Sequence, residues 1–130
     1  MIRRNDYLNR LKMAIGRSPV TALLGPRQCG KTTLARQLAS HQAATFFDIE
    51  SVPDRRRLQN PELMLGSLTG LVVLDEIQAM PELIQVLRVL VDRPENQTRF
   101  LILGSASPEI IKSASETLAG RVEFIELQGF

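Results

Sequence analysis

The stretch Gly-Pro-Arg-Gln-Cys-Gly-Lys-Thr at residues 25–32 constrains this chain most, because it matches the pattern G-x-x-x-x-G-K-[ST] at every fixed position. A strand-like apolar run at 20–24 precedes it, and a helical pattern at 31–41 follows it. Glycine adopts backbone angles that residues with a Cβ avoid, so Gly25 and Gly30 let successive N–H groups turn towards one anion at a helix N-terminus. The stretch therefore predicts a site for the phosphates of a nucleoside triphosphate.

Two side chains of the stretch have predicted roles of their own. The Lys31 ammonium is expected between the β- and γ-phosphates, and the Thr32 hydroxyl suits Mg²⁺. Cys29 occupies a variable position, where it is either a small tolerated residue or a redox-sensitive thiol beside Lys31. The predicted nucleotide contacts are Gly25, Pro26, Arg27, Gln28, Cys29, Gly30, Lys31, Thr32 and Thr33.

A second motif follows some forty residues later, where Leu-Val-Val-Leu-Asp-Glu at 71–76 matches a Walker B pattern. Four aliphatic residues indicate a strand buried in a parallel sheet, and the acid pair follows at its carboxyl end, where ligands collect in open α/β sheets. Asp75 is expected to hold Mg²⁺ opposite Thr32, and Glu76 to orient and polarise the attacking water as a general base.

Strands and helices alternate along the rest of the chain. Further strands are predicted at 44–49, 100–103 and 121–127, the last exposed on one side with Val122, Phe124 and Leu127 as its apolar residues. Helices are predicted at about 5–16, 31–41, 51–60, 61–67, within 77–92 from near Pro81, and from about 107 to 118. This alternation predicts an α/β three-layer sandwich with a five-stranded, mainly parallel sheet.

The fourth strand delivers small polar residues to the edge that carries the acid pair. Ser105 is the predicted sensor of the γ-phosphate or the attacking water. In the alternative interpretation, Ser107 and Pro108 merely start the next helix.

Composition bounds the class of protein. With 130 residues, 44% hydrophobic and 23% charged, we expect one globular domain over 1–130. No apolar run reaches a membrane-spanning length, and the N-terminus lacks an apolar signal region. The single cysteine excludes an internal disulfide and suits a reducing, cytoplasmic location. His41 has no Cys, His or carboxylate cluster around it in the sequence, so a zinc-type site is not expected.

Charge is unevenly distributed. Residues 1–57 hold 11 Arg and Lys against 4 Asp and Glu, a net +7, whereas residues 58–130 hold 5 against 10, a net −5. A basic half is compatible with nucleic-acid contact, but it equally fits a triphosphate site plus solvated surface such as Arg55–Arg57. Tyr7, on an amphipathic helix, either packs against the sheet or lines an adenine pocket.

Three stretches together resemble the core of an AAA+-type P-loop ATPase. They are Leu-Gly-Pro-Arg-Gln-Cys-Gly-Lys-Thr-Thr-Leu at 24–34, Leu-Asp-Glu-Ile-Gln at 74–78 and Leu-Ala-Gly-Arg-Val-Glu at 118–123. The residues in these three stretches are similar to those of a bacterial and archaeal family whose members join an N-terminal ATPase domain to a C-terminal domain of unknown function. The resemblance implies strand order 5-1-4-3-2 and ATP with Mg²⁺ as ligands. It also implies that Arg121 lies where related enzymes place an arginine finger that acts on a neighbouring subunit, so an oligomer is one option and a solvated arginine the other.

The family's helical lid and C-terminal domain have no counterpart in these 130 residues. The first hypothesis is therefore an Mg²⁺-dependent ATPase core, with Lys31, Glu76, Ser105 and Arg121 as catalytic residues and Thr32 and Asp75 as metal ligands. The second is a nucleotide-dependent switch or interaction module, which hydrolyses little and acts through an unknown protein partner, the missing C-terminal region or nucleic acid. A small-molecule kinase ranks last, because such enzymes lack an acid pair placed to activate water. The absence of an N-K-x-D element favours adenine over guanine.

Overall fold

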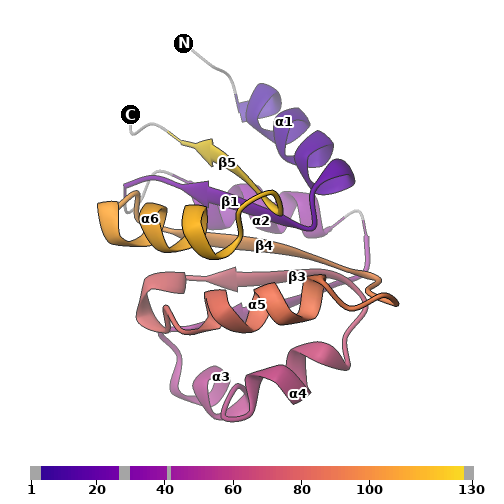
Figure 1. The fold of residues 1–130 in the computed structure, drawn as a ribbon. Helices are drawn as coiled ribbons and strands as arrows, with labels where there is room; N and C mark the ends of the chain where they lie inside the picture. Colours follow the sequence, from indigo (N-terminus) through magenta and orange to yellow (C-terminus); the bar gives the residue numbers. More distant parts are fainter. Residues whose placement is uncertain (1–3, 27–29, 41, 128–130) are drawn as a thin grey trace.

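The computed structural model describes residues 4–26, 30–40 and 42–127, with the side chains from Asp6 onward. Within them the chain forms a parallel five-stranded sheet with helices on both faces (Figure 1). The strands are β1 (Val20–Leu24), β2 (Ala44–Asp48), β3 (Gly70–Asp75), β4 (Thr98–Gly104) and β5 (Val122–Glu126). Their order is β2-β3-β4-β1-β5, and every neighbouring pair is parallel. Read from the other side this is 5-1-4-3-2, so the predicted fold class and strand order are confirmed.

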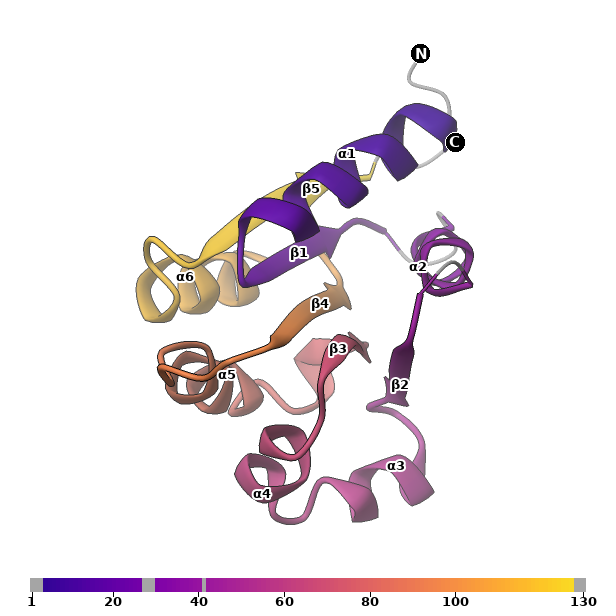
Figure 2. The same cartoon turned by 90° about the vertical axis from the view of Figure 1, so that its right-hand side faces the viewer.

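Helices cover the two faces in separate groups. They are α1 (Arg4–Arg17), α2 (Lys31–Ala39), α3 (Val52–Arg57), α4 (Pro61–Gly66), the 3-10 turn η1 (Ile77–Ala79), α5 (Leu83–Val91) and α6 (Pro108–Thr117). Viewed along the sheet, α2 lies on one face and α5 and α6 lie on the other, with α3 and α4 beyond β2 (Figure 2). The result is the three-layer arrangement expected from the sequence.

The central strands divide their side chains between two hydrophobic cores. On β3, Val72 and Leu74 pack in the core beneath α5 and α6, whereas Leu71 and Val73 pack in the core beneath α1 and α2. Successive strand residues point to opposite faces, so a run of four aliphatic residues is buried on both sides. This burial holds the carboxyl ends of β1, β3 and β4 at one edge of the sheet, which we call the carboxyl edge; the opposite edge is the amino edge.

Strand β5 lies at the margin of the sheet as expected, but its apolar residues face differently from the prediction. Phe124 is 38% exposed, whereas Ile125 and Leu127 are buried in the core beneath α1. Val122 packs against the other core. The expected set of Val122, Phe124 and Leu127 was wrong because side chains alternate along a strand, so residues 124 and 127 cannot share a face.

One helix start agrees with the prediction and one helix end differs from it. Helix α5 starts at Leu83, two residues after Pro81, near where the sequence predicts it, and the short turn η1 precedes it. Helix α2 ends at Ala39 instead of 41. Helix ends carry little periodicity, so the pattern locates them only to within a few residues.

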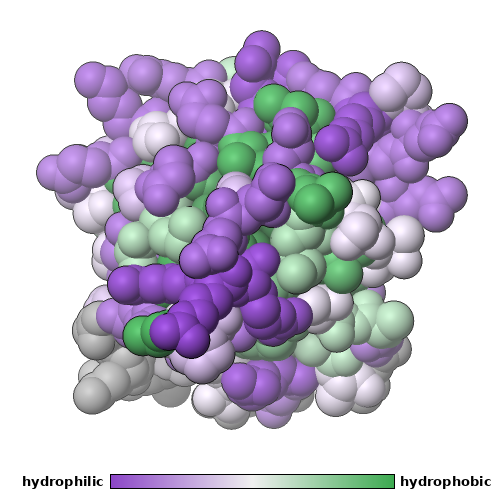
Figure 3. Space-filling model, turned by 90° about the horizontal axis from the view of Figure 1, so that it is seen from below, coloured by the Kyte–Doolittle hydropathy of each residue, from purple (hydrophilic) through white to green (hydrophobic). Residues whose placement is uncertain are grey.

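Two surface questions are also decided by the fold. Tyr7 is buried in the core beneath α1, which supports the packing interpretation. Arg55, Arg56 and Arg57 are exposed on α3, as a solvated helix face predicts. Viewed from the side of α3 and α4, this face is largely hydrophilic with scattered apolar patches (Figure 3).

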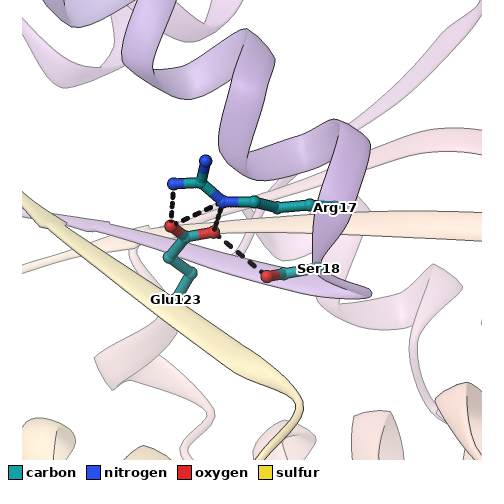
Figure 4. A network of polar contacts seen from close by, with 3 residues as sticks. All are labelled: Arg17, Ser18 and Glu123. Carbon is teal, nitrogen blue, oxygen red and sulfur yellow. Dashed lines mark hydrogen bonds and ion pairs between the residues drawn. The ribbon is translucent and has the colours of Figure 1, made fainter.

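An ion pair ties α1 to β5 at the amino edge. The Arg17 guanidinium donates to both carboxylate oxygens of Glu123, and the Ser18 hydroxyl donates to the same carboxylate at 3.0 Å (Figure 4). The guanidinium lowers the pKa of Glu123.

Within the described residues, no helix combines the length and apolar character that crossing a membrane requires.

Candidate functional site

The loop after β1 joins the strand to α2 through a left-handed glycine. Gly30 has φ 94° and caps α2, a conformation that a residue with a Cβ adopts only with strain. The first N–H groups of a helix have no partner within it, so the N-terminus of α2 presents donors to an anion. At the other end of the loop, the Gly25 N–H donates to the Gly104 carbonyl at 3.1 Å. The loop is thus anchored to β4 as well as to its own strand.

Lys31 is held by the loop itself. Its side chain is only 6% exposed, and Nζ donates to the carbonyls of Gly25 at 2.9 Å and Pro26 at 2.7 Å. These contacts fix the ammonium at the loop, where the sequence predicts the phosphates. The predicted residues Arg27, Gln28 and Cys29, and also His41, lie outside the described residues.

A hydrogen bond connects the loop helix to the acid strand. The Thr32 hydroxyl donates to Oδ2 of Asp75 at 2.8 Å, although the two residues are 43 positions apart. The other carboxylate oxygen, Oδ1, is buried and accepts no hydrogen bond from the described residues. Burial raises the pKa of Asp75, the neighbouring carboxylates of Glu76 and Asp48 add to the rise, and the Thr32 hydrogen bond opposes it.

This pair fits a magnesium ion. A hydroxyl and a carboxylate are hard oxygen ligands, and Mg²⁺ typically takes one or two protein oxygens and completes its shell with water and substrate phosphates. The unpartnered Oδ1 of Asp75 is an acceptor that a cation would satisfy. Within the described part of the chain, no cluster of three or more His, Cys, Asp or Glu side chains is placed to hold a metal ion. The Thr32–Asp75 pair would therefore supply two oxygen ligands and leave the remaining positions of a bound ion to water and phosphates.

Glu76 shares one open pocket with the loop. A pocket of about 270 Å³ is lined by Gly30, Lys31, Thr32, Thr33 and Glu76. Glu76 lies just past the end of β3 and has φ 64°, the one positive φ among the described residues other than glycine. Such a conformation is costly for a residue with a Cβ and clusters at functional sites. The acid pair and the phosphate loop are therefore brought together as the sequence predicted.

Ser105 follows the strand that lies between the two motifs. Strand β4 pairs with both β1 and β3, so its carboxyl end lies between the loop and the acid pair. Ser105 is half-buried, one residue after the Gly104 that bonds the loop. The alternative interpretation holds for Ser107, whose hydroxyl accepts from the Ile110 N–H at 3.3 Å and caps α6. The two serines thus have different positions, and the sensor role stays a prediction for Ser105.

Arg121 lies away from the other predicted residues. It immediately precedes β5, and its carbonyl accepts from the N–H of Val20 at the start of β1, so it belongs to the amino edge. Its guanidinium donates to both carboxylate oxygens of Asp92, at 2.7 and 2.8 Å, and to the Ala119 carbonyl at 2.8 Å. It therefore does not join the loop and the acid pair of its own chain.

Two residues of the site were missed by the sequence reasoning. Gln78 donates through Nε2 to the Glu76 carboxylate, and Gly104 packs directly against the Gln78 amide. The sequence carried a weak signal for both. Gln78 belongs to the quoted Leu-Asp-Glu-Ile-Gln stretch, and Gly104 ends the apolar run of the fourth strand.

The chain matches the AAA domain family over residues 17–130. It is 53% identical over 129 residues to the uncharacterized proteins Mb2031c of Mycobacterium bovis and Rv2008c of Mycobacterium tuberculosis. Each match covers 99% of this chain and 29% of the relative, so the chain spans less than a third of the length of these curated relatives.

Solved structures share the fold at low sequence identity. The Walker-type ATPase PABY2304 of Pyrococcus abyssi superposes with a TM-score of 0.71 at 16% identity and covers all of this chain and 54% of that one. The ADP form of the Aeropyrum pernix ORC2 protein gives 0.54 at 21% identity, with 96% of this chain and 46% of that chain covered. The P-loop NTPase domain of a sigma-54 activator from E. coli gives 0.57 at 16% identity and covers 96% of this chain and 98% of that one. With the loop, the acid strand and the strand between them arranged as described, this chain belongs to the AAA domain family and has the fold of P-loop nucleotide-binding ATPases.

Proposed function

We propose that this chain binds ATP and hydrolyses it with Mg²⁺. The observation that carries the proposal is the 2.8 Å hydrogen bond between Thr32 and Asp75, which joins the phosphate loop to the acid strand beside a pocket that also contains Glu76. A phosphate site alone would serve many functions. A phosphate site with a magnesium ligand pair and a second carboxylate at its mouth is typical of nucleotide hydrolysis.

Phosphate binding falls to the loop. The N–H groups at the start of α2 donate to the phosphate oxygens, and the Lys31 ammonium, fixed by the carbonyls of Gly25 and Pro26, lies against the β- and γ-phosphates. Thr32 and Asp75 would hold Mg²⁺, which would neutralise charge on the phosphates when bound. In that arrangement the buried Oδ1 of Asp75 gains the partner that it lacks among the described residues.

Hydrolysis falls to Glu76. Its carboxylate accepts a proton from a water molecule as the water oxygen bonds to the γ-phosphorus, and the bond from that phosphorus to the β–γ bridging oxygen breaks. ADP leaves with the bridging oxygen, and the proton passes from Glu76 to the released phosphate. We assign to Ser105, which follows the central strand β4, the role of donating to the γ-phosphate or orienting the water; its position one residue after Gly104 supports the assignment.

The direct test is steady-state phosphate release from ATP and Mg²⁺ by this chain, with Glu76→Gln and Lys31→Ala beside it. We expect Glu76→Gln to retain ATP and to lower turnover by on the order of 100-fold, because it removes the general base but keeps the shape of the side chain. Lys31→Ala should lose both binding and turnover. Unchanged turnover in Glu76→Gln would contradict the assigned role, and GTP in place of ATP tests the preference for adenine.

A nucleotide-dependent switch is the second candidate. It is favoured by the length of the curated relatives, of which this chain spans 29%, since their remaining sequence is available to complete or use the site. ATP bound through Lys31 without turnover would move this candidate ahead. Its partner would be protein, a second copy of the chain or nucleic acid, and steep weakening of binding by salt would identify nucleic acid.

The single cysteine is the ground for proposing a cytoplasmic location.

A further inference from the structure

The turn after β3 is built in an unusual way. Glu76 has φ 64°, so the chain leaves the strand in a left-handed conformation and enters the short 3-10 turn Ile77–Ala79. In this turn Gln78 comes back towards the residue two positions before it, and its Nε2 donates to Oε2 of Glu76. Strain in this turn therefore accompanies a specific side-chain contact to the predicted general base.

The other end of the Gln78 amide is enclosed. Its Oε1 is buried and accepts no hydrogen bond from the described residues. It lies against Gly104, where an added Cβ would come within 2.6 Å of Oε1 and within 2.9 Å of the Ile77 side chain. A residue with a Cβ at this point of β4 would have to displace the amide from its observed position.

The orientation of the amide follows from its surroundings. If the amide were reversed, its oxygen would face the Glu76 carboxylate, and two acceptors would oppose each other. The amide therefore points its donor at Glu76 and leaves its oxygen unpaired. An unpaired buried acceptor destabilises a protein, so the contact that favours this orientation of the amide is its donation to Glu76.

Gln78 also lies where three parts of the site meet. Gly104, which it contacts, accepts the hydrogen bond from the Gly25 N–H of the phosphate loop and directly precedes Ser105. A chain of contacts thus runs from the loop through the end of β4 and the Gln78 amide to Glu76.

We propose that Gln78 is a positioning residue for Glu76. It deepens the proposed function and rests on it. By donating to Oε2, the amide fixes the rotation of the carboxylate and leaves Oε1 of Glu76 to accept the proton of the attacking water. The fit of the amide against Gly104 ties this orientation to the end of β4, where the γ-phosphate is to be sensed.

The test compares kcat and KM for ATP hydrolysis in Gln78→Met, Glu76→Gln and the unsubstituted chain. Methionine has a similar length and fills the same space, but it has no donor. We expect kcat to fall by roughly 10-fold or more with KM within about twofold, because misplacement of a catalytic group affects the chemical step. The melting temperature should stay the same or rise, since the unpaired oxygen is gone. Gln59→Met, at an exposed position on the surface, is the matched control and should leave kcat, KM and the melting temperature unchanged.

The outcomes separate the inference from the proposed function. Turnover that is lost in Glu76→Gln but unchanged in Gln78→Met would overturn the role of Gln78 alone. A kcat that rises in Gln78→Met would also overturn it, because the contact would then restrain Glu76 rather than position it. No turnover in the unsubstituted chain would overturn the proposed function, and the positioning role with it.

A second measurement reports on the contact without turnover. The side-chain NH₂ resonances of Gln78 should shift in Glu76→Ala and remain in place in Glu82→Ala, an exposed position on the same segment. Resonances that stay unchanged in Glu76→Ala would show that the contact is not maintained in solution and would overturn the inference. Gly104→Ala should lower kcat in the same direction as Gln78→Met, because its methyl group displaces the amide.

Discussion

The polar groups at the two edges of the sheet differ in whether they have hydrogen-bond or ion-pair partners. At the amino edge, charged and hydroxyl groups are paired within the protein: Arg17 and Ser18 with Glu123, and Arg121 with Asp92. At the carboxyl edge, Oδ1 of Asp75 and Oε1 of Gln78 are buried without a partner among the described residues; the third such atom, Oγ1 of Thr21, lies within β1. Buried polar groups are normally satisfied, so the two unpaired ones beside the pocket of the loop and Glu76 indicate a place for a ligand.

Pocket volume favours a different place from the unpaired polar groups, and it is the weaker indicator of the site. Two larger pockets, of about 380 and 410 Å³, lie beside α4: one between the end of α4 and the segment that leads into β4, the other along α4 itself. The pocket with the loop and Glu76 is about 270 Å³. The smaller pocket is lined by Lys31, Thr32 and Glu76, so residue chemistry rather than volume identifies the candidate site. Four substitutions test this contrast between the edges.

The largest effect is expected from Lys31→Ala at the carboxyl edge. It removes a nearly buried ammonium that the loop carbonyls hold in place, and ATP affinity should fall by on the order of 100-fold, as for the truncation of one member of a buried charge pair. Isothermal titration with ATP measures the change. Lys112→Ala, exposed on α6, is the matched control. Equal affinities in the two variants would break the assignment of the phosphate site.

Asp75→Asn should separate ligand binding from stability. Burial raises the pKa of Asp75, so the folded carboxyl holds its proton more tightly than the unfolded one does. This contribution favours folding below the ordinary aspartate pKa and is lost as the pH rises through the folded value. At neutral pH the variant should therefore melt a little higher than the parent without nucleotide, and the difference should narrow towards acidic pH.

The same variant should need roughly tenfold more Mg²⁺ for half-maximal turnover, since one hard ligand has lost its charge. Thermal melting across pH and a Mg²⁺ titration are the two measurements. Glu116→Gln, exposed on α6, provides the control. A lower melting temperature at every pH would show that Asp75 serves stability, as the paired groups of the amino edge do.

Thr98→Val tests the amino edge. The Thr98 side chain is 5% exposed, and its hydroxyl donates to the Leu68 carbonyl at 2.7 Å. Valine keeps the shape and removes the donor, so the free energy of unfolding should fall by about 1 kcal/mol while ATP affinity is unchanged. Denaturant unfolding measures the loss, with exposed Thr69→Val as control. A change in ATP affinity would mean that the two edges are coupled.

Arg121→Ala should have the smallest effect on the isolated chain. The Arg121–Asp92 pair is at the surface, where ion pairs contribute little. The guanidinium lowers the pKa of Asp92, so its small contribution is present above the ordinary aspartate pKa and is lost as the pH falls through the folded value. Thermal melting at neutral and acidic pH tests this expectation.

An arginine finger would show itself differently. Because Arg121 lies at the amino edge, it can reach a nucleotide only on a neighbouring chain, and its pair with Asp92 would first have to open. Turnover per chain would then rise with protein concentration, and Arg121→Ala would abolish the rise. Turnover that is independent of concentration and unchanged in the variant would leave Arg121 as a structural residue.

Local sequence was sufficient for much of the site. The loop pattern predicted the turn into α2 at Gly30, and the run of four aliphatic residues placed Asp75 at a strand end, because a buried parallel strand needs such a run. Phosphate binding by the loop stays a prediction. The strand order came from resemblance, since hydrophobic pattern does not specify which strands pair. The facing of β5 was misjudged because its apolar residues alternate between two cores, and periodicity does not say which core each strand residue meets.

What the sequence by itself determined is the residue types at the candidate site and the alternation of strands and helices that carries them. These depend on residue types and short spacings, which act locally. What only the tertiary structure decided is which groups meet: Thr32 with Asp75 across 43 positions, and Gln78 between Glu76 and Gly104. The pairing of Arg121 with Asp92 was decided in the same way. The physical reason is that Thr32 and Asp75, Gln78 and Gly104, and Arg121 and Asp92 come from segments far apart in the chain, whose relative positions are set by the packing of the whole sheet. The Gln78–Glu76 contact is local, but it depends on the left-handed turn at Glu76.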